Sequence, residues 1–449
     1  MNAFSQEKTL ESLRGVPVAA IFIAAFITQF CMGIEVMFRI SASSNIKEQF
    51  FDAVDPLTSG AHIGEILGVL FLGFAIANFI AAPFVDAIGL KRVHLAGILT
   101  FLAGTATLCL AVPKTDSAYA LLWWGSLLQG LAWGALESVL NPLVVSIYPT
   151  RKVGRLNIFH AAYAFGMLSA APIALLCENA GFGWKIEVCV VFMPALAALI
   201  LASRLRYPAS ERVIHGVSFG QMFRYTLKVP LFYFCMIAMF LTAATELVTA
   251  NWINLTLTKV VGISGFWLVA FIYTVHAFVK MFAGVINRRL GSSGMMTTGS
   301  ALAAVGLWLL SAAHNPLSGM IAALVFGVGT ASMWATTLAL TSERFPAGGS
   351  FAIGTVAAAG MLSTYMMMPI FGKLFDAAKI QAAGGATAFK ALVVDSPLYD
   401  KVTLSAATDI FRHGSVMPML TVLFYGVLWW RDYQRKNDAV RYAASVVTD

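Results

Sequence analysis

The sequence predicts an all-α membrane protein with twelve transmembrane helices in two pseudo-symmetric six-helix bundles. Of its 449 residues, 59% are hydrophobic and only 12% are charged, and the mean hydropathy is +0.78. A helix needs about 20 apolar residues to cross the hydrocarbon core of a bilayer. Strands that cross a membrane are about ten residues long and alternate in polarity, so these longer apolar stretches favour helices.

Twelve stretches have the required length and apolar character. They cover approximately residues 17–41, 62–84, 94–112, 119–147, 156–176, 186–204, 231–257, 264–287, 295–313, 317–340, 351–375 and 413–430. A polar segment after the sixth stretch divides the chain into an N-terminal bundle over 1–203, a linker over 204–228 and a C-terminal bundle over 229–449 with a polar tail. We expect an amphipathic helix over 218–227 and a long outer loop over 376–412.

The basic residues predict the orientation of the chain. Placing both termini and the linker in the cytoplasm puts 19 of the 30 Lys and Arg residues on the cytoplasmic side, as the positive-inside rule requires. The net charge of +8 is therefore attributed to membrane topology, and no nucleic-acid partner is expected. The compact loops favour a bacterial inner (plasma) membrane. We expect the lipid bilayer as a partner and the protein as a monomer.

A weak internal repeat supports the division into two halves. Tyr148-Pro149 aligns with Phe345-Pro346, an offset of 197 residues (345 minus 148). The same offset places Glu137 opposite Trp334, which makes Trp334 a candidate for a shared central cavity, although aromatic residues inside a bundle are more often packing residues.

Three carboxylates stand inside apolar stretches: Glu35, Glu137 and Glu246. An acid at the centre of a membrane helix costs roughly 2.5–3.5 kcal/mol even on lenient scales, and such residues are usually functional. The three together predict a polar pathway for ions or solute. Glu137 and Asn141 are four residues apart and share one helix face, where a carboxylate and an amide suit the hydroxyl groups of a solute.

Glu35 and Arg39 repeat the four-residue spacing in the first stretch. Burial disfavours an ionised carboxyl group whereas a nearby cation favours it, so this pair is a candidate for proton coupling. Arg39 is either the partner of Glu35 or a residue that reaches the outer interface. His160 in the fifth stretch is a candidate proton relay, or else a hydrogen-bonded core histidine.

The seventh and eighth stretches carry a second polar cluster. Glu246, Asn251 and Trp252 lie in one stretch, and carboxylates, amides and aromatic faces are groups that bind sugars. His276 and Lys280 are four residues apart in the next stretch. Lys280 either binds solute or forms a structural ion pair with Glu246.

The loop after the second stretch contains Asp86, Gly89, Lys91 and Arg92. Together with twelve helices and a central basic linker, this Asp-x-x-Gly-x-Lys-Arg pattern resembles the major facilitator superfamily. The resemblance implies the major facilitator fold, and it implies that these four residues control the conformational change. The alternative for the basic residues is plain positive-inside charge.

A finer resemblance lies in the fourth and fifth stretches. Glu137-x-x-x-Asn141-Pro142, followed by Arg155-Leu156-Asn157-x-x-His160, resembles the fucose/glucose-galactose proton symporter branch. The resemblance implies sugar uptake coupled to protons, with Glu35 as proton carrier and Glu137 as sugar ligand. The chain departs from the branch at Val279-Lys280, where the branch has Gly-Arg.

We therefore expect a symporter that imports a monosaccharide or similar polyhydroxylated solute by alternating access, driven by protons, with sodium as the other candidate ion. Solute would contact Glu137, Asn141, Asn157, Glu246, Asn251, Trp252, His276, Lys280 and Trp334. One alternative is an anionic solute such as a sugar acid or carboxylate, recognised by Arg39 and Lys280. The second is a non-transporting membrane sensor on a transporter scaffold. No nucleotide-binding, metal or catalytic motif is present, so no cofactor and no enzymatic activity are expected.

Overall fold

The computed structural model describes residues 13–54, 58–149, 151–209, 211–214, 216–257, 265–393 and 396–448. Its first half consists of α2 (Val18–Ile46), η1 (Lys47–Asp52), α3 (Ser59–Ile88), α4 (Leu90–Cys109), α5 (Ala118–Ile147), α6 (Lys152–Asn179), α7 (Trp184–Cys189) and α8 (Phe192–Arg204). The linker forms α9 (Glu211–Ile214) and α10 (Phe219–Leu227).

The second half consists of α11 (Pro230–Ala243), η2 (Ala244–Val248), α12 (Thr249–Leu257), α13 (Gly265–Ser311), α14 (Pro316–Thr330), α15 (Met333–Arg344), η3 (Pro346–Gly348), α16 (Gly349–Ala382), α17 (Ala386–Lys390), α18 (Pro397–Gly414) and α19 (Val416–Thr448). No strand occurs among the described residues. The prediction of an all-α membrane fold is confirmed.

Ten helical stretches within the described ranges are long and apolar enough to cross a membrane. The longest, α13, contains Gly291 with φ of 70° and ψ of 167°, a conformation outside the helical region. This break separates the predicted stretches 264–287 and 295–313, so α13 holds two of the expected spans. The predicted last span lies in α19, whose helix extends to Thr448.

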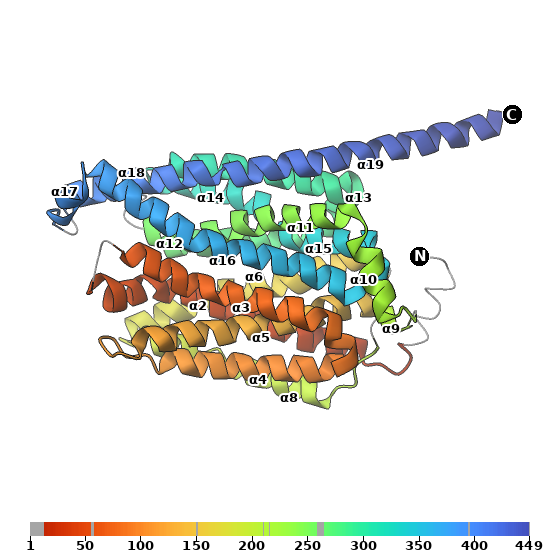
Figure 1. The fold of residues 1–449 in the computed structure, drawn as a ribbon, viewed down its shortest axis with the longest axis horizontal. Coiled ribbons are helices and arrows are strands. Elements are labelled where there is room, and N and C mark those ends of the chain that lie inside the picture. Colours follow the sequence, from red (N-terminus) through yellow and green to blue (C-terminus); the bar gives the residue numbers. More distant parts are fainter. Residues whose placement is uncertain are drawn as a thin grey trace.

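Helices from the first half of the chain occupy one side of the bundle and helices from the second half the other, as the colours of Figure 1 show. Contact between the sides is made by α3 with α16 and by α6 with α13. The linker helices α9 and α10 lie at one end of the bundle, together with the last turns of α19, and α17 lies at the opposite end (Figure 1).

The linker helix was predicted closely. Helix α10 begins after Ser218, whose hydroxyl accepts from the Gln221 amide N–H while the Gln221 side chain accepts from the Ser218 N–H. This reciprocal capping box satisfies amide donors that the first turn of a helix leaves free. Linker residues 210 and 215 and the N-terminal residues 1–12, whose cytoplasmic position was predicted, lie outside the described residues.

The prediction of a long loop over 376–412 is wrong. Helix α16 continues to Ala382, and α17 and α18 follow. The sequence signal for α18 is local: the Ser396 hydroxyl accepts from the Tyr399 amide N–H, and Pro397 occupies the first turn, where its missing N–H costs nothing. Helix α18 is amphipathic rather than apolar, so its sequence has no long apolar run that would indicate a membrane span.

Two glycines allow the helices around the centre to approach closely. A Cβ atom on Gly130 of α5 would clash with the carbonyl oxygen of Leu70 in α3, and one on Gly33 of α2 would clash with that of Tyr163 in α6. Small residues at such crossings are what brings membrane helices into backbone contact. These contacts fix the distance between α3 and α5 and the distance between α2 and α6.

Replacing Gly130 by Val is expected to destabilise the protein by about 3 kcal/mol, the upper end of overpacking penalties, because the clash is with backbone rather than with a flexible side chain. The fraction of monodisperse protein that survives heating, measured by size-exclusion chromatography in detergent, should fall. Gly154→Ala is the matched control, since nothing lies within 4 Å of its added Cβ. Equal heat resistance of the two variants would show that the α3–α5 contact is not as close as described.

Candidate functional site

A small cavity lies between the two sides of the bundle. Helices α2, α3, α5 and α6 contribute residues from one side, and η2, α13, α15 and α16 from the other. The lining residues are Gln29, Met32, Phe71, Phe74, Trp133, Glu137, His160, Tyr163, Glu246, Leu247, Lys280, Trp334 and Met361.

Glu137 is held in the cavity wall by two amides. The Gln29 Nε2 atom of α2 donates to Glu137 Oε1 at 3.0 Å, and the Asn141 Nδ2 atom donates to Glu137 Oε2. Asn141 also donates to the main-chain oxygen of Glu137 at 3.1 Å. Both carboxyl oxygens therefore act as acceptors, which is the pattern of an ionised carboxylate.

His160 completes this network from α6. Its Nε2 atom lies 2.9 Å from Asn141 Oδ1, which can only accept, so Nε2 carries the proton. Its Nδ1 atom lies 3.4 Å from Gln29 Nε2, which can only donate, so Nδ1 is bare. With these amide orientations His160 is a neutral imidazole in a single tautomer. The Gln29 carbonyl oxygen is buried and makes no hydrogen bond within the described structure.

Glu246 faces the cavity from the other side. It lies in η2, a short π-helical segment within the seventh span, and such π-bulges occur frequently at functional sites. Its Oε1 atom is 3.6 Å from His276 Nδ1, and His276 Nε2 is 2.9 Å from the Thr330 hydroxyl. His276 itself is fully buried behind Glu246 and is absent from the cavity wall.

Lys280 lies one turn beyond His276 on α13 and lines the cavity. Its ammonium group interacts electrostatically with both Glu246 and Glu137. The shortest ion-pair contact of Glu246 among the described residues is with His276 and not with Lys280. The cation is therefore shared between the two halves of the cavity rather than bound to one acid.

Glu35 and Arg39 lie beside the cavity rather than in its wall. The Arg39 Nε atom is 3.7 Å from Glu35 Oε1. Glu35 is 0% exposed, and neither of its carboxyl oxygens has a hydrogen-bond partner in the described part of the chain. A buried carboxylate in this setting is costly to ionise.

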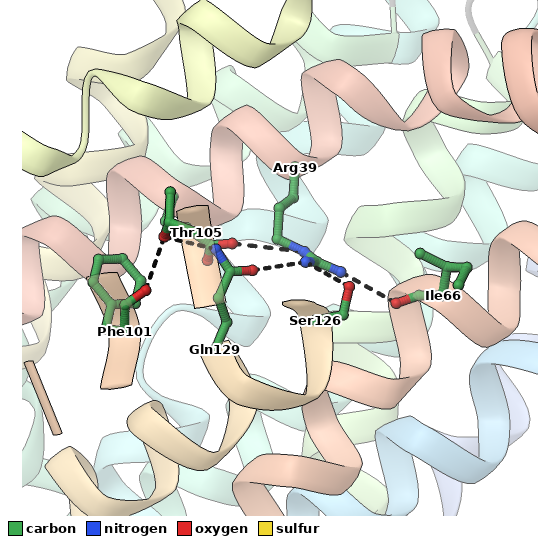
Figure 2. Close-up of polar contacts among 7 residues, drawn as sticks. Arg39, Ile66, Phe101, Thr105, Ser126 and Gln129 are labelled. Atoms are coloured by element: carbon green, nitrogen blue, oxygen red, sulfur yellow. Dashed lines mark hydrogen bonds and ion pairs between the residues drawn. The ribbon is translucent and has the colours of Figure 1, made fainter. Parts of the chain in front are cut away.

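Arg39 is fixed by neutral acceptors, as Figure 2 shows. Its Nη1 atom donates to Gln129 Oε1 at 2.9 Å and to the Ser126 hydroxyl at 3.1 Å, and its Nη2 atom donates to the Ile66 carbonyl at 3.2 Å. Gln129 in turn donates to the Thr105 hydroxyl at 3.0 Å. Arg39 thus ties α2 to α3 and α5 and does not extend to the outer surface.

The remaining predicted solute ligands differ in position. Trp334 lines the cavity, where its ring meets Phe74 edge-on at a centroid distance of 6.3 Å. Asn251 donates to the Leu247 carbonyl at 2.8 Å. Trp252 packs on Phe375 of α16 at 5.6 Å. Asn157 is fully buried, and like Asn251 and Trp252 it is absent from the cavity wall.

The predicted gating loop joins α3 to α4. Gly89 has φ of 98°, a conformation that favours glycine. The Lys91 Nζ atom donates to the Ser203 carbonyl at the end of α8, at 2.6 Å, and Arg92 donates to the Ile88 carbonyl at 3.5 Å. Asp86 lies in the last turn of α3. The loop is thus bonded to the end of the sixth span, and none of its four residues lines the cavity.

Several cavity residues were not predicted. Gln29 is an amide inside the first apolar stretch, six residues before Glu35, and that position was a usable signal. Trp133 and Tyr163 lie one turn from Glu137 and His160 on the same helices, so helical periodicity pointed to them. Phe71, Phe74 and Met361 carry no sequence signal, because apolar residues of this kind fill every helix contact.

Residues 18–279 match the family model described as Major Facilitator Superfamily. A segment of 142 residues is 30% identical to the sugar transport protein MST3 of Oryza sativa subsp. japonica, covering 31% of this chain and 26% of that protein. The alignment thus spans about a quarter of that relative's length.

Solved structures share the fold at low identity. The proton:xylose symporter XylE bound to 6-bromo-6-deoxy-D-glucose matches with a TM-score of 0.69 and 14% identity, over 91% of this chain and 94% of that one. The E. coli fucose:proton symporter FucP gives 0.60 and 13%, over 88% and 98%. The human organic anion transporter MFSD10 gives 0.64 and 12%, over 91% and 99%. With the family model covering more than half of its length, the chain belongs to the major facilitator superfamily of membrane transporters.

Proposed function

We propose that this transporter imports a monosaccharide or similar polyhydroxylated solute together with protons. The observation that carries the proposal is the composition of the cavity wall: Glu137 and Gln29 on one side, Glu246 and Lys280 on the other, and Trp133 and Trp334 among the apolar residues. Hydroxyl groups of a sugar both donate and accept hydrogen bonds, and its C–H faces pack on aromatic rings. The sugar symporters XylE and FucP, which share the fold, agree with this choice of solute.

Alternating access would move an N-terminal unit over 1–203 against a C-terminal unit over 229–449, with 204–228 as the connection. The cavity supports this division because both units contribute to its wall. The units meet through α3 with α16 and α6 with α13. Rocking at these two contacts would open the cavity to one side of the membrane at a time. We place both termini and the linker in the cytoplasm of a bacterial cell.

Glu35 is our candidate for the residue that binds and releases the transported proton. Its carboxyl group is fully buried and lacks hydrogen-bond donors, which favours the neutral form until the surroundings open to water. Arg39, held by Ser126 and Gln129, is a fixed partner that would stabilise the ionised form after proton release. Solute and proton would be coupled if solute binds better while Glu35 is neutral.

An anionic solute such as a sugar acid is the second candidate. It is favoured by the buried Lys280 in the cavity wall and by the fold shared with an organic anion transporter. Against it, two carboxylates face the same space. A non-transporting sensor would bind solute without exchanging it across the membrane, so solute counterflow distinguishes that possibility from transport.

Glu35→Gln is expected to abolish concentrative uptake while counterflow of labelled solute continues, because the glutamine is permanently neutral. Uptake into proteoliposomes with an imposed pH gradient measures concentrative uptake, and exchange of labelled solute without a gradient measures counterflow. Glu178→Gln, at the exposed end of α6, is the matched control and should resemble the wild type. Gradient-driven accumulation by Glu35→Gln would exclude Glu35 as the proton carrier. A sodium gradient in place of the pH gradient tests the other ion.

Glu137→Gln is expected to weaken solute binding about tenfold or more, because the new amide presents a donor to Gln29 or Asn141 and leaves buried groups unpaired. Thermal-shift titrations with D-xylose, D-glucose and L-fucose measure the affinity, again with Glu178→Gln as control. Unchanged affinity would remove Glu137 from the binding site.

Neutral sugars are expected to shift the melting temperature of the wild type, and D-gluconate is expected to give a smaller shift or none. The two carboxylates outnumber the single lysine in the cavity wall, so an added negative charge is repelled. The reverse order, with gluconate stabilising most and Lys280→Gln abolishing its effect, would favour the anionic solute.

A further inference from the structure

We propose that Glu246 and His276 form a second proton-binding site, in the C-terminal half, which is loaded and unloaded separately from Glu35. This inference rests on the proposed proton-coupled function and adds a site to it. The pair lies at the cavity, yet only Glu246 reaches the cavity wall. His276 stands behind it, fully buried between Glu246 and Thr330.

A buried ring nitrogen without a partner beside a carboxyl group carries the argument. The closest atoms are His276 Nδ1 and Glu246 Oε1, 3.6 Å apart. This separation is too long for a hydrogen bond, and Nδ1 makes none in the described part of the chain. A proton added to the pair would be held on an imidazolium or on a protonated carboxyl group.

Thr330 indicates which ring nitrogen carries the proton. Its hydroxyl lies 2.9 Å from His276 Nε2 and donates to the Phe326 carbonyl at 2.9 Å. Nε2 therefore carries a proton and donates to the hydroxyl oxygen, and a neutral ring leaves Nδ1 bare beside Glu246. Protonation of Nδ1 or of the Glu246 carboxyl group then gives the pair one more proton.

The pair can therefore bind a proton while Nε2 keeps its hydrogen bond to Thr330 in both states, which avoids the penalty for an unpaired buried group. Thr330 acts as a positioning residue, because it fixes the proton on Nε2 and leaves Nδ1 to face Glu246, without touching solute.

The surrounding charges give loading a consequence. The titratable groups that face the pair are Lys280 and Tyr273 of α13, Tyr163 of α6 and, through Lys280, Glu137 of α5. Helix α16 contributes Met361 to the wall. With neutral tyrosines, an unloaded pair leaves Glu246, Glu137 and Lys280 with a net charge of −1. Loading brings this total to zero, which favours closure of the cavity around a neutral solute, because buried unbalanced charge is costly.

The test is a pH titration of the purified protein in lipid nanodiscs without any solute. Infrared difference spectroscopy monitors the titration. The wild type is expected to show a carboxyl or imidazolium signal that Glu246→Gln and His276→Gln both remove. Glu35→Gln is expected to retain it. Because no solute is present, the result does not depend on whether the protein transports sugars.

Thr330→Val and Thr330→Ser form the matched pair of variants. Valine has the shape of threonine without the hydroxyl, so the loaded pair loses its acceptor and should bind its proton about tenfold more weakly, which moves the midpoint about one pH unit lower. Serine restores the hydroxyl and should restore the wild-type midpoint. The proposal is overturned if Glu246→Gln leaves the signal unchanged, or if Thr330→Val titrates like the wild type.

Discussion

The hydrogen bonds that buried polar groups make with one another are the constraint on which this structure depends. Lipid offers no partners, so buried polar groups in a span are stabilised by partners on their own helix or on a neighbouring one. Glu137 accepts a hydrogen bond from Gln29 of α2, and Arg39 donates one to Gln129 of α5. Such bonds select which helices lie side by side and in which rotation, and the same bonds define the wall of the central cavity.

The two halves of the cavity differ in the partners that they provide for a buried carboxyl group. In the N-terminal half, amides donate to both oxygens of Glu137, and His160 is fixed in one neutral form. In the C-terminal half, Glu246 faces a histidine whose outer nitrogen meets a hydroxyl able to donate or accept. Amide donors stabilise a fixed negative charge, whereas the Glu246–His276 pair leaves one ring nitrogen without a hydrogen-bond partner in the described part of the chain. On our proposals, the first half would recognise solute and the second would bind and release a proton.

Close helix approach is what makes these short side-chain bonds geometrically available. The glycines at the α2–α6 and α3–α5 crossings leave no room for a Cβ atom, so the helices there touch through their backbones. Gln29 can consequently reach Glu137 and His160 from a third helix. The position of the cavity follows from packing, and its chemistry follows from the few polar residues that packing brings to face it.

The sequence by itself determined the membrane class, the six-plus-six order of spans and the residues that carry charge inside the bilayer, because apolar length and buried ionisable groups are properties of single segments. Residues 376–412 were predicted to form a loop, because an amphipathic helix such as α18 lacks a long apolar run. Only the tertiary structure decided that Glu246 lies closest to His276 while Lys280 interacts with both Glu246 and Glu137, that Arg39 donates to Gln129, and that Gln29 lines the cavity. Those choices depend on the rotation and separation of helices distant in sequence, which no local pattern encodes.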